Sequence, residues 1–223
     1  LRRHRQPRRV GEERPRERRR QLLVEHRQPV GVDQVALGDD HQAATHAEQL
    51  ARYVSGRRIE RLLADVGTVV PGRKIDDDAN LLLRYEGGAR GILHCSQIAT
   101  GEENRLTLRV YGSKASLEWA QEEPNFLTVR YADGPTQVLK PGNGYLTPQA
   151  QRAARLPSGH PEAFFEAFAN IYREIAQQRM AIQLGAPVPQ HPYPRIEEGV
   201  HTMDFIEACV ASQREGRWVQ VPG

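Results

Sequence analysis

The sequence has only two cysteines, few aromatic residues and no long apolar run. Cys95 and Cys209 lie too far apart to suggest a disulfide framework or a metal knuckle, so a reducing cytoplasm is the simplest compartment. No apolar stretch approaches the roughly 20 residues that a membrane-spanning helix needs, and the arginine-rich start lacks the apolar core of a secretory signal. We therefore expect a cytoplasmic protein with no membrane partner.

Lysine is also scarce, and the positive charge is concentrated at the start of the chain. Residues 1–27 hold eleven arginines and four glutamates, a surplus of seven positive charges, whereas the whole chain carries a net charge of only +3. Such a segment can bind nucleic acid through phosphate contacts. It has no aromatic residue to stack on a base, so we favour a solvated tail and do not expect a nucleic-acid partner. We interpret residues 1–44 as a basic segment, disordered or non-native, that lies outside the folded domain.

The middle of the chain has the pattern of an antiparallel series of strands. Leu106, Leu108 and Val110 alternate with polar neighbours, which is typical of a strand with one buried face. Glu86-Gly87-Gly88 is a short glycine-containing connection that predicts a hairpin. The expected strands cover residues 58–70, 80–85, 89–99, 106–111, 116–120, 126–131 and 137–140.

A short helix is expected over residues 45–54, and two amphipathic helices close the chain. The apolar stripes of these two helices are Phe164, Phe168, Ile171, Tyr172 and Ile175 in the first, and Ile196, Val200, Met203, Ile206 and Val210 in the second. Strands followed by helices, without strict alternation, indicate an α+β fold. We expect an open, mostly antiparallel sheet with helices packed on one face.

Three separated segments resemble one known family, in the right order. They are residues 54–119, GHPEAFFEAFANIYREIA and EGVHTMDFIEACVASQREGRWVQV. Together they look like the carboxy-terminal domain of the Gfo/Idh/MocA oxidoreductases, the glucose–fructose oxidoreductase and inositol dehydrogenase family. The resemblance implies that residues 45–223 form a domain with two roles. One side of its open sheet would line a sugar or polyol site, and the other would make a homo-oligomer interface.

The same resemblance implies NAD or NADP as cofactor, bound by an amino-terminal Rossmann domain that also supplies a catalytic lysine. Such a domain needs a glycine-rich turn, because backbone N–H groups and a helix N-terminus must approach the pyrophosphate closely. Residues 1–44 contain no lysine and only three glycines, which do not form that turn. We therefore expect the Rossmann domain to be absent, no residue of this chain to bind the cofactor, and the chain alone to be inactive.

One catalytic residue can be carried over from the family to this chain. Family members have a Gly-Asp-x-Gly-x-His pattern in which Asp and His share one face of the helix that joins the domains. Thr45-His46 matches the end of that pattern, but Gln42 stands where the Asp is expected. A histidine near the substrate hydroxyl can accept its proton as the hydride leaves. His46 is therefore the candidate acid–base residue, and a polar residue on the first turn of a surface helix is the alternative.

Two further histidines are candidates for substrate binding. His160, with Glu162, opens a helix after a long loop, where polar groups can meet a ligand, although helix capping is the interpretation we favour. His94 lies within an expected strand, and either faces the substrate cleft or is a half-buried sheet residue.

Acidic residues suggest two other sites, neither of which we favour. Asp39, Asp40, His41 and His46 do not place three ligands on one element, so we expect no metal site. The run Asp76–Asp78 could supply paired carboxylates, but consecutive strand residues point to opposite faces, which favours a solvated entry into a strand.

Two functions from different classes follow from these observations. The first is the substrate-binding half of an NAD(P)-dependent sugar or polyol dehydrogenase. The second is a non-catalytic sheet module for oligomerisation or partner binding.

Overall fold

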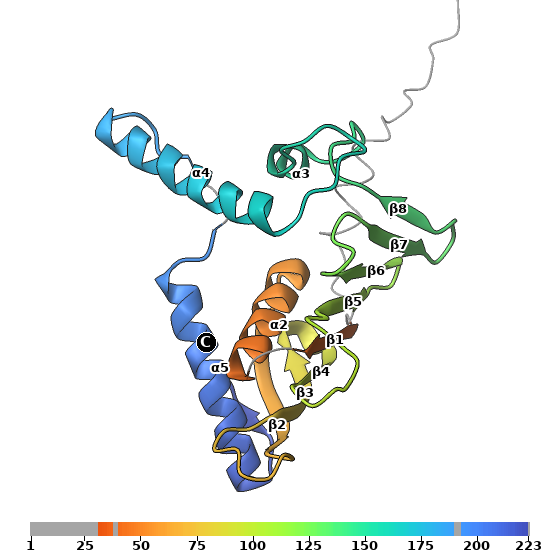
Figure 1. Ribbon diagram of the computed structural model, residues 1–223, viewed down its shortest axis with the longest axis vertical. Coiled ribbons are helices and arrows are strands. Elements are labelled where there is room, and N and C mark those ends of the chain that lie inside the picture. The colour runs from red at the N-terminus through yellow and green to blue at the C-terminus, as the bar shows by residue number, and fades with distance from the viewer. Residues whose placement is uncertain (1–30, 38–39, 190–192, 223) are drawn as a thin grey trace, which may run out of the picture.

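The computed structural model describes residues 31–37, 40–189 and 193–222. Within them, one nine-stranded sheet has the order β8-β7-β6-β5-β1-β4-β3-β2-β9 (Figure 1). Its neighbouring strands are antiparallel except for β1 and β4, which are parallel. The strands are β1 (Gly31–Leu37), β2 (Ile59–Gly67), β3 (Asp78–Tyr85), β4 (Arg90–Ser96), β5 (Thr107–Tyr111), β6 (Ala115–Ala120), β7 (Leu127–Tyr131), β8 (Gln137–Leu139) and β9 (Val219–Gln220).

The helices are α2 (Asp40–Ser55), α3 (Pro148–Ala153), α4 (Phe164–Gln183) and α5 (Ile196–Glu215), with a 3-10 turn η1 (Glu86–Gly88) between β3 and β4. In the described part of the chain, no helix combines the length and the apolar character needed to cross a bilayer.

The described fold begins upstream of the boundary that we expected at Thr45. Strand β1 lies in the middle of the sheet, parallel to β4 and antiparallel to β5, and α2 begins at Asp40. The helix also extends the one expected over residues 45–54 by five residues at its start. The charged segment at residues 1–27 lies outside the described residues, so the choice between a solvated tail and a nucleic-acid-binding arm stays a prediction.

The expected antiparallel strands are confirmed. In β5, Leu108 and Val110 are buried while Arg109 and Tyr111 are exposed, as their alternation predicted. The β3–β4 hairpin turns through Gly87 and Gly88, whose φ values of 74° and 82° lie in the left-handed region that glycine adopts without strain.

Helices α2 and α5 pack on the same face of the sheet, and the core lies between them and the strands (Figure 1). Side chains on the opposite face, among them Leu82, Ile92 and Tyr111, are exposed. The predicted α+β fold, with helices on one face of an open, mostly antiparallel sheet, is therefore confirmed. The core is made by Ala44, Ala47 and Ala51 of α2, Phe205, Ala208 and Cys209 of α5, and sheet residues that include Leu62, Leu81, Leu83, Tyr85, Leu93 and Leu108.

The predicted inward face of α5 was wrong. Four of the five apolar residues expected to face the core, Ile196, Val200, Met203 and Val210, are exposed. The buried face is displaced around the helix and consists of His201, Thr202, Phe205, Ala208, Cys209 and Ser212. This face combines core residues such as Phe205 with Thr202 and Ser212, which accept hydrogen bonds from α2 and β2 that an apolar stripe could not accept.

Helix α4 also differs from the expectation of an apolar face against a core. Phe164, Phe168, Ile171, Tyr172 and Ile175 are all exposed, and the helix extends away from the sheet (Figure 1). It is tied to the end of α3 by hydrogen bonds from its side chains, such as Asn170 Nδ2 to the Ala153 carbonyl at 2.6 Å. The helical period identified the apolar stripe correctly, but it carries no information about what covers that stripe.

Candidate functional site

His46 lies on the solvent side of α2. The opposite side of this helix is formed by Ala44, Ala47 and Ala51, whose spacing of three and four residues turns them all toward the sheet. Because their side chains are small, α2 can lie close to the strands. His46 is exposed, so its imidazole is accessible to a ligand while the helix beneath it is fixed.

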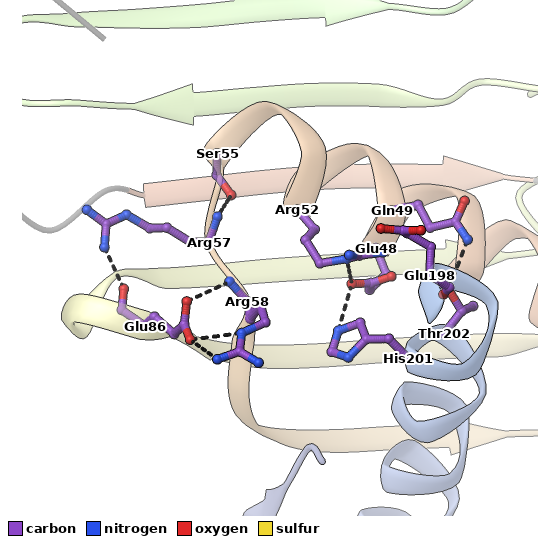
Figure 2. Close-up of polar contacts among 10 residues, drawn as sticks. All are labelled: Glu48, Gln49, Arg52, Ser55, Arg57, Arg58, Glu86, Glu198, His201 and Thr202. Carbon is purple, nitrogen blue, oxygen red and sulfur yellow. Dashed lines mark hydrogen bonds and ion pairs between the residues drawn. The ribbon is translucent and has the colours of Figure 1, made fainter. Parts of the chain in front are cut away.

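Glu48, two residues further along α2, points the other way and is fully buried (Figure 2). Its Oε1 accepts a hydrogen bond from Arg52 Nε at 3.1 Å and lies 3.5 Å from Nε2 of His201 on α5. Burial raises the pKa of Glu48, partly offset by Arg52. Burial likewise lowers the pKa of His201. This polar contact joins α2 to α5 on the buried side of α2, whereas His46 lies on its exposed side.

A second polar contact joins the same helices. Gln49 Nε2 donates to Thr202 Oγ1 at 2.9 Å, and that hydroxyl in turn donates to the Glu198 carbonyl one turn earlier in α5. Glu198 also receives the backbone N–H of Arg195 at the start of the helix, which lowers the pKa of its carboxyl. Helix α5 is therefore capped and held against α2 by neighbouring side chains (Figure 2).

The carboxyl end of α2 is fixed by the hairpin turn between β3 and β4. Arg58 Nη2 and Nε lie 2.7 and 2.9 Å from Glu86 Oε1, and Arg57 Nη1 donates to the Glu86 carbonyl at 2.7 Å. The hydrogen bond from Arg58 lowers the pKa of Glu86. Arginine's planar guanidinium is suited to such paired contacts. Helix α2 is thus held near its middle by α5 and just beyond its carboxyl end by this turn.

His94 lies on the other face of the sheet from His46. Its neighbours in β4, Leu93 and Cys95, are in the core beneath the helices, so the alternation of a strand turns His94 to the open face. There it is half-buried, with Nε2 3.3 Å from Asp78 Oδ1. The sheet itself therefore separates His94 from His46.

His160 is exposed in the turn before α4, with Nδ1 3.2 Å from the Pro157 carbonyl. The capping interpretation for His160 and Glu162 was wrong, because α4 begins at Phe164. The N-terminal bond is made instead by Glu166, whose carboxylate accepts the Ala163 N–H at 2.9 Å. Glu162 accepts the N–H groups of two residues in the preceding loop and is not part of the cap. No hydrogen bond or ion pair among the described residues joins His160 to the other two histidines.

Asp77 is a structural residue that the sequence patterns did not single out. The interpretation of residues 76–78 as a solvated strand entry was wrong for this member, whose carboxylate is buried. It accepts the Val69 and Val70 N–H groups at 2.7 and 3.0 Å and contacts Arg73 at 3.3 Å, which closes the loop between β2 and β3. Its pKa is lowered, chiefly by the bond from Val69. Only a view of the folded loop shows this role.

A metal site was considered at His46 and its acidic neighbours. In the parts of the chain with described side chains, no three His, Cys, Asp or Glu residues gather as metal ligands.

Comparison with known proteins places this sheet and its two helices in one family. A family model described as the GFO/IDH/MocA C-terminal domain matches residues 41–118. The uncharacterized oxidoreductase YfiI of Bacillus subtilis is 34% identical over 192 residues, which is 82% of this chain and 47% of the relative. The chain belongs to the Gfo/Idh/MocA family, as a carboxy-terminal domain.

Solved structures of oxidoreductases have the same fold. An oxidoreductase from Sinorhizobium meliloti is 38% identical with a TM-score of 0.78, over 86% of this chain and 56% of that one. An inositol dehydrogenase homologue from Azotobacter vinelandii, complexed with NADH and myo-inositol, is 32% identical with a TM-score of 0.80, over 91% of this chain and 60% of that one. The present chain spans about half the length of the curated relatives it matches.

One glycine-containing turn among the described residues can be compared with the phosphate turn of a nicotinamide-dinucleotide site. A Gly-x-Gly sequence between a strand and a helix occurs at Gly142–Gly144, before α3. This turn packs against the protein's own loop, since a Cβ at Gly142 would lie 2.7 Å from the Ser158 nitrogen. A dinucleotide phosphate needs that space for itself, together with the start of a longer helix.

Proposed function

We propose that this chain is the substrate-facing half of an NAD(P)-dependent dehydrogenase of a sugar or polyol. The observation that carries the proposal is the similarity to the inositol dehydrogenase homologue complexed with NADH and myo-inositol, which extends over 91% of this chain. An exposed histidine on a firmly held helix suits the proton-transfer part of such a reaction.

His46 is the proposed acid–base residue, which would take the proton of the substrate hydroxyl. His160 is the proposed substrate contact, because its loop leaves the imidazole exposed. His94 does not join them in one site, since a single small polyol cannot reach both faces of the sheet. We place His94 on the proposed assembly face instead.

Binding of myo-inositol would test this arrangement directly. We expect millimolar myo-inositol to shift the imidazole NMR signals of His46 and His160, and to leave those of His94 unchanged. His46→Ala and His160→Ala should weaken binding, while His94→Ala serves as the matched control on the other face. A response confined to His94, or no histidine response at all, would refute the site.

We also propose that the chain by itself neither binds NAD(P) nor oxidises polyols. A fluorescence titration with NADH and NADPH checks the first part, and saturable binding would contradict it. NAD-linked polyol oxidation that is lost in His46→Ala would overturn the second part while supporting the role of His46.

A second candidate function is assembly through the open face of the sheet. Leu82, Ile92 and Tyr111 come from three different strands and are exposed on that face. Exposed apolar side chains of this kind mark surfaces that associate. We expect a homo-oligomer by analytical ultracentrifugation and a smaller species for Ile92→Asp, with the α4 variant Ile182→Asp as control. A monomer at all concentrations would exclude this function.

A further inference from the structure

Three buried polar atoms gather where α2, α5 and β3 meet. They are Glu48 Oε2, Tyr85 Oη and His201 Nε2, and none has a hydrogen-bond partner among the described residues. Leaving such atoms unsatisfied in a core costs free energy, so neighbouring groups of this kind are expected to pair with one another. The closest approach is between His201 Nε2 and Glu48 Oε1, at 3.5 Å.

The backbone of Pro222 also acts on His201 and raises the pKa of its imidazole. Because proline has no N–H, the imidazole can only be the donor in that interaction. Nε2 has no hydrogen-bond partner among the described residues, so we assign the ring proton to Nδ1. A neutral His201 in that tautomer presents a bare lone pair on Nε2 to Glu48.

We propose that Glu48 and His201 share one buried proton, and that this proton fastens α2 to α5. Without it, the carboxylate and the Nε2 lone pair would face each other as two acceptors. With it, either an O–H of Glu48 donates to Nε2, or an N–H of His201 donates to the carboxylate. Both arrangements satisfy the same contact, so the proton belongs to the pair.

The surrounding groups favour the neutral form of this pair. Arg52 donates to Glu48 but does not outweigh its burial, which raises the pKa of the carboxyl. Burial lowers the pKa of His201, as do Arg52 and Arg58, while Asp204 acts in the opposite direction.

Tyr85 faces the same carboxyl from β3. Burial raises the pKa of its hydroxyl, so it stays neutral while the pair titrates.

A shared proton makes the junction sensitive to alkaline pH. In the unfolded chain both groups lose their protons by about pH 6.5, whereas the folded pair keeps one. Above that pH the folded state binds more protons, so stability falls as pH rises, by up to tenfold in the folded-to-unfolded ratio per pH unit. Below about pH 4.5 the unfolded chain binds the extra proton, and stability falls again. The free energy of unfolding is therefore constant between about pH 4.5 and about pH 6.5 and declines on both sides of that range.

Urea unfolding of the full chain between pH 5 and 9 tests the proposal. Wild type should lose stability from about pH 6.5 upward. Glu48→Gln keeps the size of the side chain and removes the titrating proton, so its profile should be flat above about pH 6.5. Below that pH its stability should fall, because the unfolded chain protonates His201 and the buried imidazole resists protonation. Glu197→Gln and His46→Gln, matched exposed variants on α5 and α2, should follow wild type. A profile of Glu48→Gln that runs parallel to wild type would overturn the proposal.

NMR of the wild-type imidazole gives a second measurement that needs no variant. His201 should show the Nδ1–H tautomer, with Nε2 in a hydrogen bond, from pH 5 to well above about pH 6.5, because the folded pair keeps its proton along the alkaline limb. An Nε2–H tautomer, or titration at the pH of an unfolded histidine, would also overturn it.

Discussion

Replacing Ser212 with alanine should weaken the attachment of strand β2 to helix α5. Strand β2 pairs with β3 along its length, but with β9 only at Arg61 and Leu62. Beyond that point, the outward N–H of Ala64 donates to Ser212 Oγ at 3.0 Å, and the hydroxyl donates to the Arg217 carbonyl at 2.7 Å. At this position of β2, the buried Ser212 hydroxyl therefore accepts the backbone N–H that a neighbouring strand would otherwise accept.

The expected loss follows from the burial of this contact. Ser212 is fully buried and Ala64 nearly so, which means that water cannot replace the hydroxyl as acceptor. An unsatisfied buried N–H costs about 1–3 kcal/mol, and we expect Ser212→Ala to lose that much free energy of unfolding. Gln213, the next residue of α5, provides a matched control. It accepts the Val66 N–H at 2.9 Å in an exposed position, where water can take its place.

Urea unfolding of both variants, followed by circular dichroism and by tryptophan fluorescence, measures the difference. Gln213→Ala should stay within about 0.5 kcal/mol of wild type. Equal losses in the two variants would mean that burial of the bond does not matter. A loss below about 0.5 kcal/mol in Ser212→Ala would refute the reasoning altogether.

Three further outcomes can be checked on the same chain. Phe205→Ala should cost about 3–5 kcal/mol in urea unfolding, because this side chain is fully buried, whereas Phe165→Ala, at a side chain 82% exposed, should stay within about 0.5 kcal/mol of wild type. Cys95 and Cys209 should react with a thiol reagent only after unfolding, since burial raises the pKa of both thiols to about 12; fast reaction of the native chain would contradict this. Asp77→Asn should lower the melting temperature near pH 7, because a carboxyl with a lowered pKa stabilises the fold above about pH 4. The variant should also lose less stability than wild type below about pH 4, and an equal loss in the two proteins would exclude this role.

The strands were predictable because their signals are local. Alternation of apolar and polar residues placed β5, and the glycine pair at residues 87–88 placed the β3–β4 turn. The order of the strands is not a local property. Strand β1 lies between β4 and β5, a position that depends on long-range pairing and that no periodicity records.

The site was predictable only in part, for a related reason. His46 was identified by resemblance, and the structure shows it exposed on α2, as both the acid–base role and the surface-residue alternative require. The structure places His94 on the opposite face of the sheet from His46, which the sequence could not show because the parity of a strand does not say which face is covered. Glu48 and His201 drew no attention in the sequence, since they are far apart in it and meet only through the packing of α2 on α5.

By itself, the sequence determined strands β2 to β8, helices α4 and α5 and most of α2, and which family the chain resembles. Both depend on spacing and residue type along a short stretch. The tertiary structure alone decided which stripe of α5 is buried, which face each histidine occupies, and which polar groups share the core. Two stripes on one helix can satisfy the same period, and the choice between them depends on whether partners for hydrogen bonds lie opposite. For α5 those partners lie in α2 and β2. The buried stripe therefore combines polar Thr202 and Ser212 with apolar residues such as Phe205, and the stripe of Ile196 and Met203 stayed exposed.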